Sequence, residues 1–135
     1  MLFHITGAHY TFSEVPFGEK ISSWFGWERN HYDRIVHFLF GALLTFPMYE
    51  IILQKISASW KWIFLITFSL IFTLGGIYEL LEWLTAIIVS PELGSAYLGT
   101  QGDEWDAQKD LGLKLLGSLV ATGFLLLKSN KFSQK

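Results

Sequence analysis

The run Trp62-Ile-Phe-Leu-Ile-Thr-Phe-Ser-Leu-Ile-Phe-Thr-Leu-Gly-Gly-Ile-Tyr78 contains no charged residue. A helix that crosses a bilayer needs about 20 predominantly apolar residues. The apolar pattern continues past Glu79 and Glu82, so we predict a transmembrane helix over about residues 62–88. At 1.5 Å per residue such a helix is about 40 Å long, which exceeds the hydrocarbon thickness. We therefore expect the two glutamates to lie near the lipid headgroups.

Two further apolar runs have the length of a membrane span. Between Ile35 and Leu53 only His37 and Glu50 are ionisable, which predicts a helix over about residues 33–53, and a last helix is expected over about 104–127. Residues 1–30 mix aromatic, glycine and charged residues, so we expect an N-terminal interfacial segment with a short helix near 18–25. The predicted fold is all-α, a polytopic membrane protein with three transmembrane helices in a single membrane domain over residues 1–135.

The composition excludes several classes of site and partner. The chain has 135 residues, of which 51% are hydrophobic, and a net charge of −2, so it offers no basic surface to nucleic acid. The expected partner is the lipid bilayer, together with partner membrane helices or a second copy of the chain. The chain has no cysteine, which excludes disulfides and thiolate metal sites. A metal would have to be held by oxygen or imidazole ligands, which favours a hard or borderline divalent ion.

The distribution of charge predicts the orientation in the membrane. With three spans, Lys55 and Lys61 lie on the same side as the C-terminal Lys128, Lys131 and Lys135. Glu50 is the one acid near them, and the other eleven acids lie on the opposite side. The positive-inside rule makes the lysine-rich side cytoplasmic. We therefore expect a cytoplasmic C-terminus and an acidic exocytoplasmic face.

The densest group of acids follows Gly99, in Gly99-Thr-Gln-Gly-Asp-Glu-Trp-Asp-Ala-Gln-Lys-Asp110. On a helix, Asp103, Asp106 and Asp110 share one face, where they repel one another unless a cation, a proton or hydrogen-bond donors lie among them. The predicted topology brings the starts of the first and third helices and the end of the second to one membrane face. The predicted metal ligands there are Asp33, His37, Glu79, Glu82, Asp103, Asp106 and Asp110.

Several functions are compatible with this acidic site. The first is a small membrane protein that binds a divalent cation without a known biochemical role. The second is a metal-dependent enzyme acting on lipid or envelope headgroups, with Asp103 or Glu79 as the catalytic base. The third is a component of proton- or cation-coupled transport, and the fourth is a scaffold subunit. Whether the protein is an enzyme is left open by the sequence.

Structural roles for the same residues are equally compatible with the pattern. Asp33 and Asp103 lie where first-turn and capping acids stabilise a helix. Asn30 is expected to cap the first transmembrane helix, and the third is expected to begin at Glu104. Glu79 and Glu82 are expected to form ion pairs with Arg29 or Arg34 in this interpretation.

Four runs resemble the YjdF-type family of bacterial inner-membrane proteins, whose function is not established. They are Gly7–Pro16, Arg29–Phe38, Tyr78–Trp83 and Gly99–Asp110, and they occur in the same order over nearly the whole chain. The resemblance implies a multi-pass protein of the bacterial inner (plasma) membrane and supplies no activity. Members of this family are longer at the N-terminus, so Leu2–Ala8 is expected to be the remainder of a further span.

A weaker similarity in layout connects the chain with VanZ-like membrane proteins. In those proteins an acid late in one helix is followed by a loop and by an aspartate-rich helix start. Here Glu79 or Glu82, then Asp106, Asp110 and Gly117, occupy the corresponding places. We treat this similarity as one of arrangement, which implies no shared activity.

Overall fold

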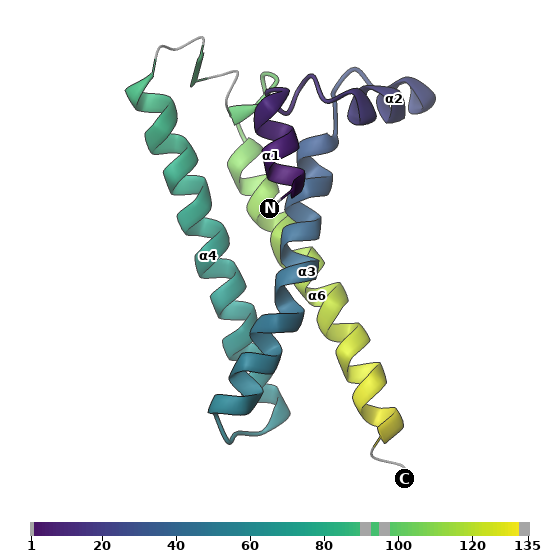
Figure 1. Ribbon diagram of the computed structural model, residues 1–135, viewed down its shortest axis with the longest axis vertical. Coiled ribbons are helices and arrows are strands. Elements are labelled where there is room, and N and C mark those ends of the chain that lie inside the picture. The colour runs from purple at the N-terminus through teal and green to yellow at the C-terminus, as the bar shows by residue number, and fades with distance from the viewer. Residues whose placement is uncertain (1, 90–92, 95–97, 133–135) are drawn as a thin grey trace. The chain divides into compact units, whose positions relative to one another are not determined.

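The computed structural model describes residues 2–89, 93–94 and 98–132, and its elements are helices (Figure 1). Lys135, on which the orientation argument drew, lies outside the described residues. The expectation of an all-α fold is confirmed. The helices are α1 (Leu2–His9), α2 (Pro16–Phe25), α3 (Tyr32–Lys55), α4 (Trp60–Ile88) and α6 (Asp106–Phe132).

Three of these helices are long and apolar enough to cross a membrane. They are α3, α4 and the part of α6 from Asp106 to Leu127. Their positions agree with the predicted spans to within a few residues. Short helices precede them, as expected for an N-terminal interfacial segment.

Local sequence explains where the helices begin and end. Pro16 opens α2, a position where its missing N–H is not needed, and Gly26 closes α2 in the left-handed conformation with φ 67°. The Asn30 side-chain oxygen accepts the N–H of Tyr32 at 3.0 Å, so Asn30 caps the start of α3. The expected start of the last helix was early by two residues, because the Asp103 carboxylate accepts the N–H of Trp105 in a turn and α6 begins at Asp106.

The chain packs as two compact units, and each is described by itself. The first, here called the polar unit, comprises Met1–Val36 and Ile77–Asp110. Its buried apolar residues are Phe12, Val15, Tyr32 and Val36. The contacts of the N-terminal helix α1 with the rest of this unit include a hydrogen bond from the Tyr32 hydroxyl to the Phe3 carbonyl at 3.0 Å and a ring contact of His4 with Tyr78 at 5.2 Å.

The second, here called the apolar unit, comprises His37–Gly76 and Leu111–Lys135. Its helices α3 and α6 approach closely at Gly41 and Gly117, where an added Cβ would overlap backbone atoms of the facing helix. The hydroxyls of Thr45 and Ser118 form a buried hydrogen bond of 2.8 Å between the same helices. In this unit Lys114 is 0% exposed, which the sequence analysis did not anticipate.

Candidate functional site

Arg34, in the first turn of α3, lies among the three aspartates that the sequence placed on one helix face. Its guanidinium donates to Asp103 at 3.1 Å and to Asp106 at 2.6 Å, and it also forms an ion pair with Asp110. A further N–H donates to the backbone carbonyl of Asp106 at 3.1 Å. The cation that these carboxylates require is therefore supplied, at least in part, by the chain itself.

Arg29 extends this network from the segment before α3. It donates to the Asp106 carboxylate at 2.5 Å and to the Thr100 carbonyl at 2.5 Å. The side chain of Arg34 is 12% exposed and that of Asp106 is 8% exposed, so these pairs are largely removed from water. Removing one partner of such a pair leaves an uncompensated charge in a place that water does not reach.

The loop that carries Gln101 is fixed by a second set of contacts. The Gln101 side chain accepts the N–H of Asn30 and donates to the carbonyl of Asn30, both at 2.9 Å. Gly99 and Gly102 have φ angles of 62° and 82°, a region that glycine adopts without a Cβ clash. The loop is thus tied to the residues just before α3 by neutral as well as by charged hydrogen bonds.

Asp103 is at the accessible edge of the network. Lys109 donates to both of its carboxylate oxygens, at 2.9 and 2.7 Å. The hydrogen bond from Lys109 is the main reason that the pKa of Asp103 lies below its ordinary value, with Trp105 N–H and Arg34 acting in the same direction. A carboxylate whose pKa is lowered is a weaker base, which disfavours Asp103 in the predicted role of catalytic base.

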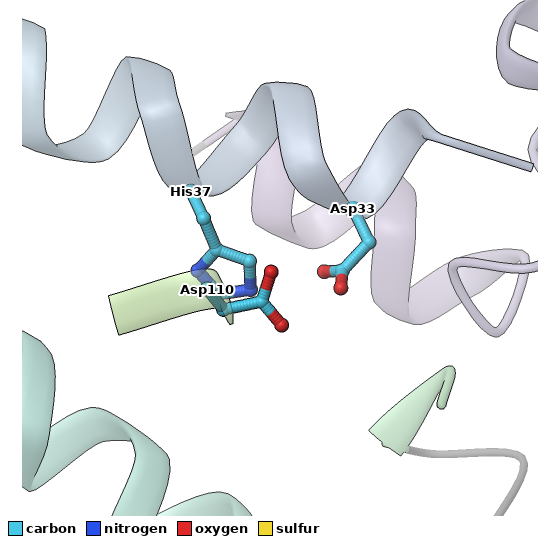
Figure 2. A group of neighbouring side chains, drawn as sticks. All are labelled: Asp33, His37 and Asp110. Atoms are coloured by element: carbon cyan, nitrogen blue, oxygen red, sulfur yellow. The ribbon is translucent and has the colours of Figure 1, made fainter. Parts of the chain in front are cut away.

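The most buried acids of the polar unit are Asp33 and Asp110, which are 3% and 2% exposed. Each offers a carboxylate oxygen within 4.8 Å of the other's. Figure 2 shows the carboxylate of Asp33, from the first turn of α3, turned toward that of Asp110 from α6. His37, also buried, projects from the same side of α3 as Asp33, one helical turn further on (Figure 2).

Glu79 and Glu82 lie together in the last part of α4, with carboxylate oxygens within 4.8 Å of each other. Glu82 is buried at 8% exposure, which agrees with its placement as an acid of a membrane helix. The ion pairs described for Arg29 and Arg34 are with aspartates, and pairing of these arginines with Glu79 or Glu82 stays a prediction.

The structure thus brings the predicted ligands together in three sets within the polar unit. Arg34 contacts the three aspartates of the 99–110 stretch, Asp33 faces Asp110, and Glu79 adjoins Glu82. Asn30 was predicted only as a helix cap, and Arg29 only as a possible partner of Glu79 or Glu82, whereas Gln101 was among the residues expected to supply hydrogen bonds around the carboxylates. One signal was available: two arginines five residues apart precede or open a membrane helix at the same face as the acids, where buried charges need partners.

Comparison with known proteins gives a family but no activity. The sequence profile of the family described as "Predicted membrane protein (DUF2238)" matches residues 1–131. The "Inner membrane protein YjdF" of Escherichia coli (strain K12) is 33% identical over 122 residues, which cover 90% of this chain and 58% of that protein. The chain therefore spans a little over half the length of this relative. No solved structure matches the chain.

Proposed function

The chain belongs to the DUF2238 family of predicted membrane proteins, and from this premise we propose that it binds a divalent cation in the bacterial inner membrane. The site of binding is the pair of buried carboxylates, Asp33 and Asp110. The acidic end of the protein faces the exocytoplasmic side in this proposal, since the lysines of the α3–α4 connection and of the C-terminus favour a cytoplasmic position.

The close approach of Asp33 and Asp110 is the observation that carries the proposal. Two carboxylates that lie within 4.8 Å of each other and are almost fully buried raise each other's cost of ionisation. A cation or a proton between them lowers that cost. Carboxylate oxygens are the preferred ligands of Mg²⁺, Mn²⁺ and Ca²⁺, and an imidazole one turn along the same helix, from His37, would extend the choice to Zn²⁺.

Arg34 supports a site of defined geometry. Its pairs with Asp106 and Asp110 hold the first turn of α6 against the first turn of α3, which positions the Asp110 carboxylate before any cation arrives. Pre-positioned ligands need no ordering when the ion binds. The remaining predicted ligands, Glu79 and Glu82, would provide a second carboxylate pair for the same or another ion.

Metal content tests this proposal directly. The protein would be purified in detergent without chelator, equilibrated with Mg²⁺, Mn²⁺ or Zn²⁺, desalted and measured by inductively coupled plasma mass spectrometry. We expect a stoichiometric ion in the parent, at least a tenfold weaker retention in Asp33→Asn, and parental retention in the control Asp103→Asn, which removes a carboxylate at the accessible edge. Helicity measured by circular dichroism would show that both variants fold.

A scaffold role is the second candidate, and the arginine–aspartate network favours it. In that case the carboxylates serve contacts within the chain, and the ion-free parent is the functional form. The absence of bound metal from a folded parent under all three conditions would contradict cation binding and favour the scaffold role. Asp33→Asn would then leave the metal content unchanged and reduce stability or association instead.

A further inference from the structure

The polar unit contains a second polar feature, a surface cavity of about 290 Å³ beside α2 that is separate from the aspartate network. The residues that line it include two acids, Glu19 and Glu28, together with Trp27, Ser22, Asn30 and Gln101. The volume is at the small end of the range for ligand pockets, which suits a headgroup rather than a large ligand.

The walls of this cavity are held by contacts within the protein. Ser22 donates to the Arg29 carbonyl at 2.7 Å, and Asn30 donates to the carbonyls of Ser13 and Val15 at 3.0 and 3.1 Å. Gln101 is held by its two hydrogen bonds to Asn30. The shape of the cavity is therefore set before any ligand binds.

The two glutamates of the cavity are not held by contacts of this kind. Among the residues that the structure describes, neither Glu19 nor Glu28 takes part in an ion pair or a side-chain hydrogen bond, and both are exposed. Two carboxylates without a partner in one cavity attract a cation that can donate several hydrogen bonds. An ammonium group has this chemistry, with three N–H donors around one charge.

Trp27 adds a second attraction for the same kind of group. Its ring is stacked on Phe25 with 4.7 Å between centroids, and the residue is 47% exposed. An ammonium over the face of a tryptophan is attracted by the negative face of the ring. Two ring contacts hold Trp27 in place: the stacking on Phe25 and a T-shaped contact with His31, whose ring centroid also lies 4.7 Å away.

The position of α2 indicates where such an ammonium would come from. In Figure 1, α2 lies across the direction of the first turns of α3, the membrane span that follows it after a short connection. Its large apolar residues are exposed: Phe17, Trp24 and Phe25 are 59%, 70% and 64% exposed. Exposed aromatic residues at the end of a span are typical of the headgroup region of a bilayer.

We propose that the cavity lined by Glu19, Glu28 and Trp27 binds the ammonium group of an amine-bearing ligand, with an aminophospholipid headgroup as the source that its position favours. The site is independent of cation binding at Asp33 and Asp110. A free small amine has the same ammonium chemistry, and the experiment distinguishes the two sources.

Native mass spectrometry of the full chain, released from detergent micelles, tests the proposal. Phosphatidylethanolamine and phosphatidylglycerol with the same acyl chains are titrated separately, and soluble glycerophosphoethanolamine is added in a third series. We expect phosphatidylethanolamine to bind at least about tenfold more tightly than phosphatidylglycerol, because only the former carries an ammonium that both glutamates can accept from.

Glu19→Gln/Glu28→Gln should weaken phosphatidylethanolamine binding about tenfold or more and leave phosphatidylglycerol binding unchanged. The control Glu14→Gln/Glu104→Gln removes the same charge from exposed acids outside the cavity lining and should behave as the parent. Trp27→Leu keeps both carboxylates and is a second variant. It should weaken phosphatidylethanolamine binding, but less than the glutamine double variant does.

Displacement of the lipid by glycerophosphoethanolamine would identify the ammonium headgroup alone as sufficient, and failure to displace it would identify the membrane lipid as the ligand. Either result supports an ammonium site. Equal affinity of the parent for the two lipids, or undiminished phosphatidylethanolamine binding by the folded glutamine double variant, would overturn the proposal.

Discussion

In the polar unit, guanidinium–carboxylate pairs join separate segments, whereas in the apolar unit the backbones of α3 and α6 approach closely at glycines. Arg34 reaches three carboxylates with one guanidinium. Gly41 and Gly117 allow α3 and α6 to approach so closely that no Cβ fits. The two units should therefore be vulnerable to opposite changes: loss of charge in the first, and gain of volume in the second.

The largest expected effect is that of Arg34→Met in the polar unit. The substitution removes the Arg34 guanidinium from the buried Asp110 and leaves Asp106 with Arg29 alone; breaking a buried pair costs about 3–5 kcal/mol in systems of this kind. Thermal unfolding followed by circular dichroism measures the loss of stability. Hydrogen exchange should become faster in residues 99–110 while residues 60–76 retain their protection.

The matched control for Arg34→Met is Arg34→Met/Asp106→Asn, which removes a carboxylate together with its partner. This double variant should recover part of the lost stability, because the isosteric amide carries no charge. An Arg34→Met variant as stable as the parent would mean that the network contributes nothing, and the distinction between the two units would no longer hold.

Gly41→Ala should have the next largest effect, and it acts on the apolar unit. The added methyl would overlap the backbone carbonyl of Lys114, which cannot move without shifting α6. Overpacking of this kind costs about 1–3 kcal/mol.

Gly123→Ala in α6 is the control, since nothing lies within 4 Å of the position of its Cβ. The control should be neutral or more stable by up to about 1 kcal/mol, because alanine favours the helix. Equal unfolding temperatures for the two alanine variants would contradict close packing at Gly41.

Lys109→Gln is expected to produce a smaller change, since Lys109 is 55% exposed and its pair with Asp103 is accessible to salt. The folded pKa of Asp103 lies below its ordinary value, so this carboxylate adds stability above the unfolded pKa and loses it as the pH falls through the folded pKa. The variant should raise the pKa of Asp103 and reduce that acid-dependent loss. Nuclear magnetic resonance titration of the carboxyl carbon would measure the pKa, and an unchanged value would show that Lys109 is not its cause.

The smallest effect is expected for His31→Gln, just before α3. Burial, followed by the charges of Arg29 and Arg34, lowers the pKa of His31 in the folded protein. The unfolded chain therefore binds a proton more readily, so this group reduces stability as the pH falls through the ordinary histidine pKa of about 6.5. The variant should flatten the dependence of unfolding temperature on pH in that range, with the parent and His9→Gln as references. A curve that is as steep as that of the parent would assign the dependence to other groups.

The membrane spans could be predicted from the sequence because they depend on local composition. The uncharged run from Trp62 to Tyr78 and the apolar run from Ile35 to Leu53 need no knowledge of neighbours. Helix ends were less predictable where a side chain competes for the backbone: the Asp103 carboxylate takes the N–H of Trp105, and α6 starts later than expected.

The residue types of the site could be predicted from the sequence, but the partner of each carboxylate could not. The spacing of Asp103, Asp106 and Asp110 predicted a cation, a proton or hydrogen-bond donors among them, but spacing alone does not distinguish a metal ion from a guanidinium. The partner depends on where the residues before α3 fold, which brings Arg29 and Arg34 to the acids.

Lys114 illustrates a different limit of sequence reasoning. A lysine about two turns inside an apolar helix is expected to extend its side chain toward water. In the structure it is fully buried, with its ammonium 3.5 Å from the Gly75 carbonyl and 5.5 Å from the Phe40 ring centre. Part of the space for its side chain exists because Gly75 of α4 has no side chain: a Cβ there would lie 3.0 Å from the Lys114 Cδ. The sequence pattern of one helix does not show where a neighbouring helix lacks a side chain.

The paired hydrogen bonds between Gln101 and Asn30 have a consequence for how the acidic loop responds to its surroundings. An amide neither gains nor loses a proton over the range in which the nearby aspartates titrate, and dissolved ions screen it little. Acidification or high ionic strength would therefore weaken the exposed pair of Lys109 and Asp103 and leave this neutral link in place. The loop that carries Gln101 would keep its position against the start of α3 while the charges of its side chains change. When neutral pH is restored, only side chains would have to move for the charged contacts to form again.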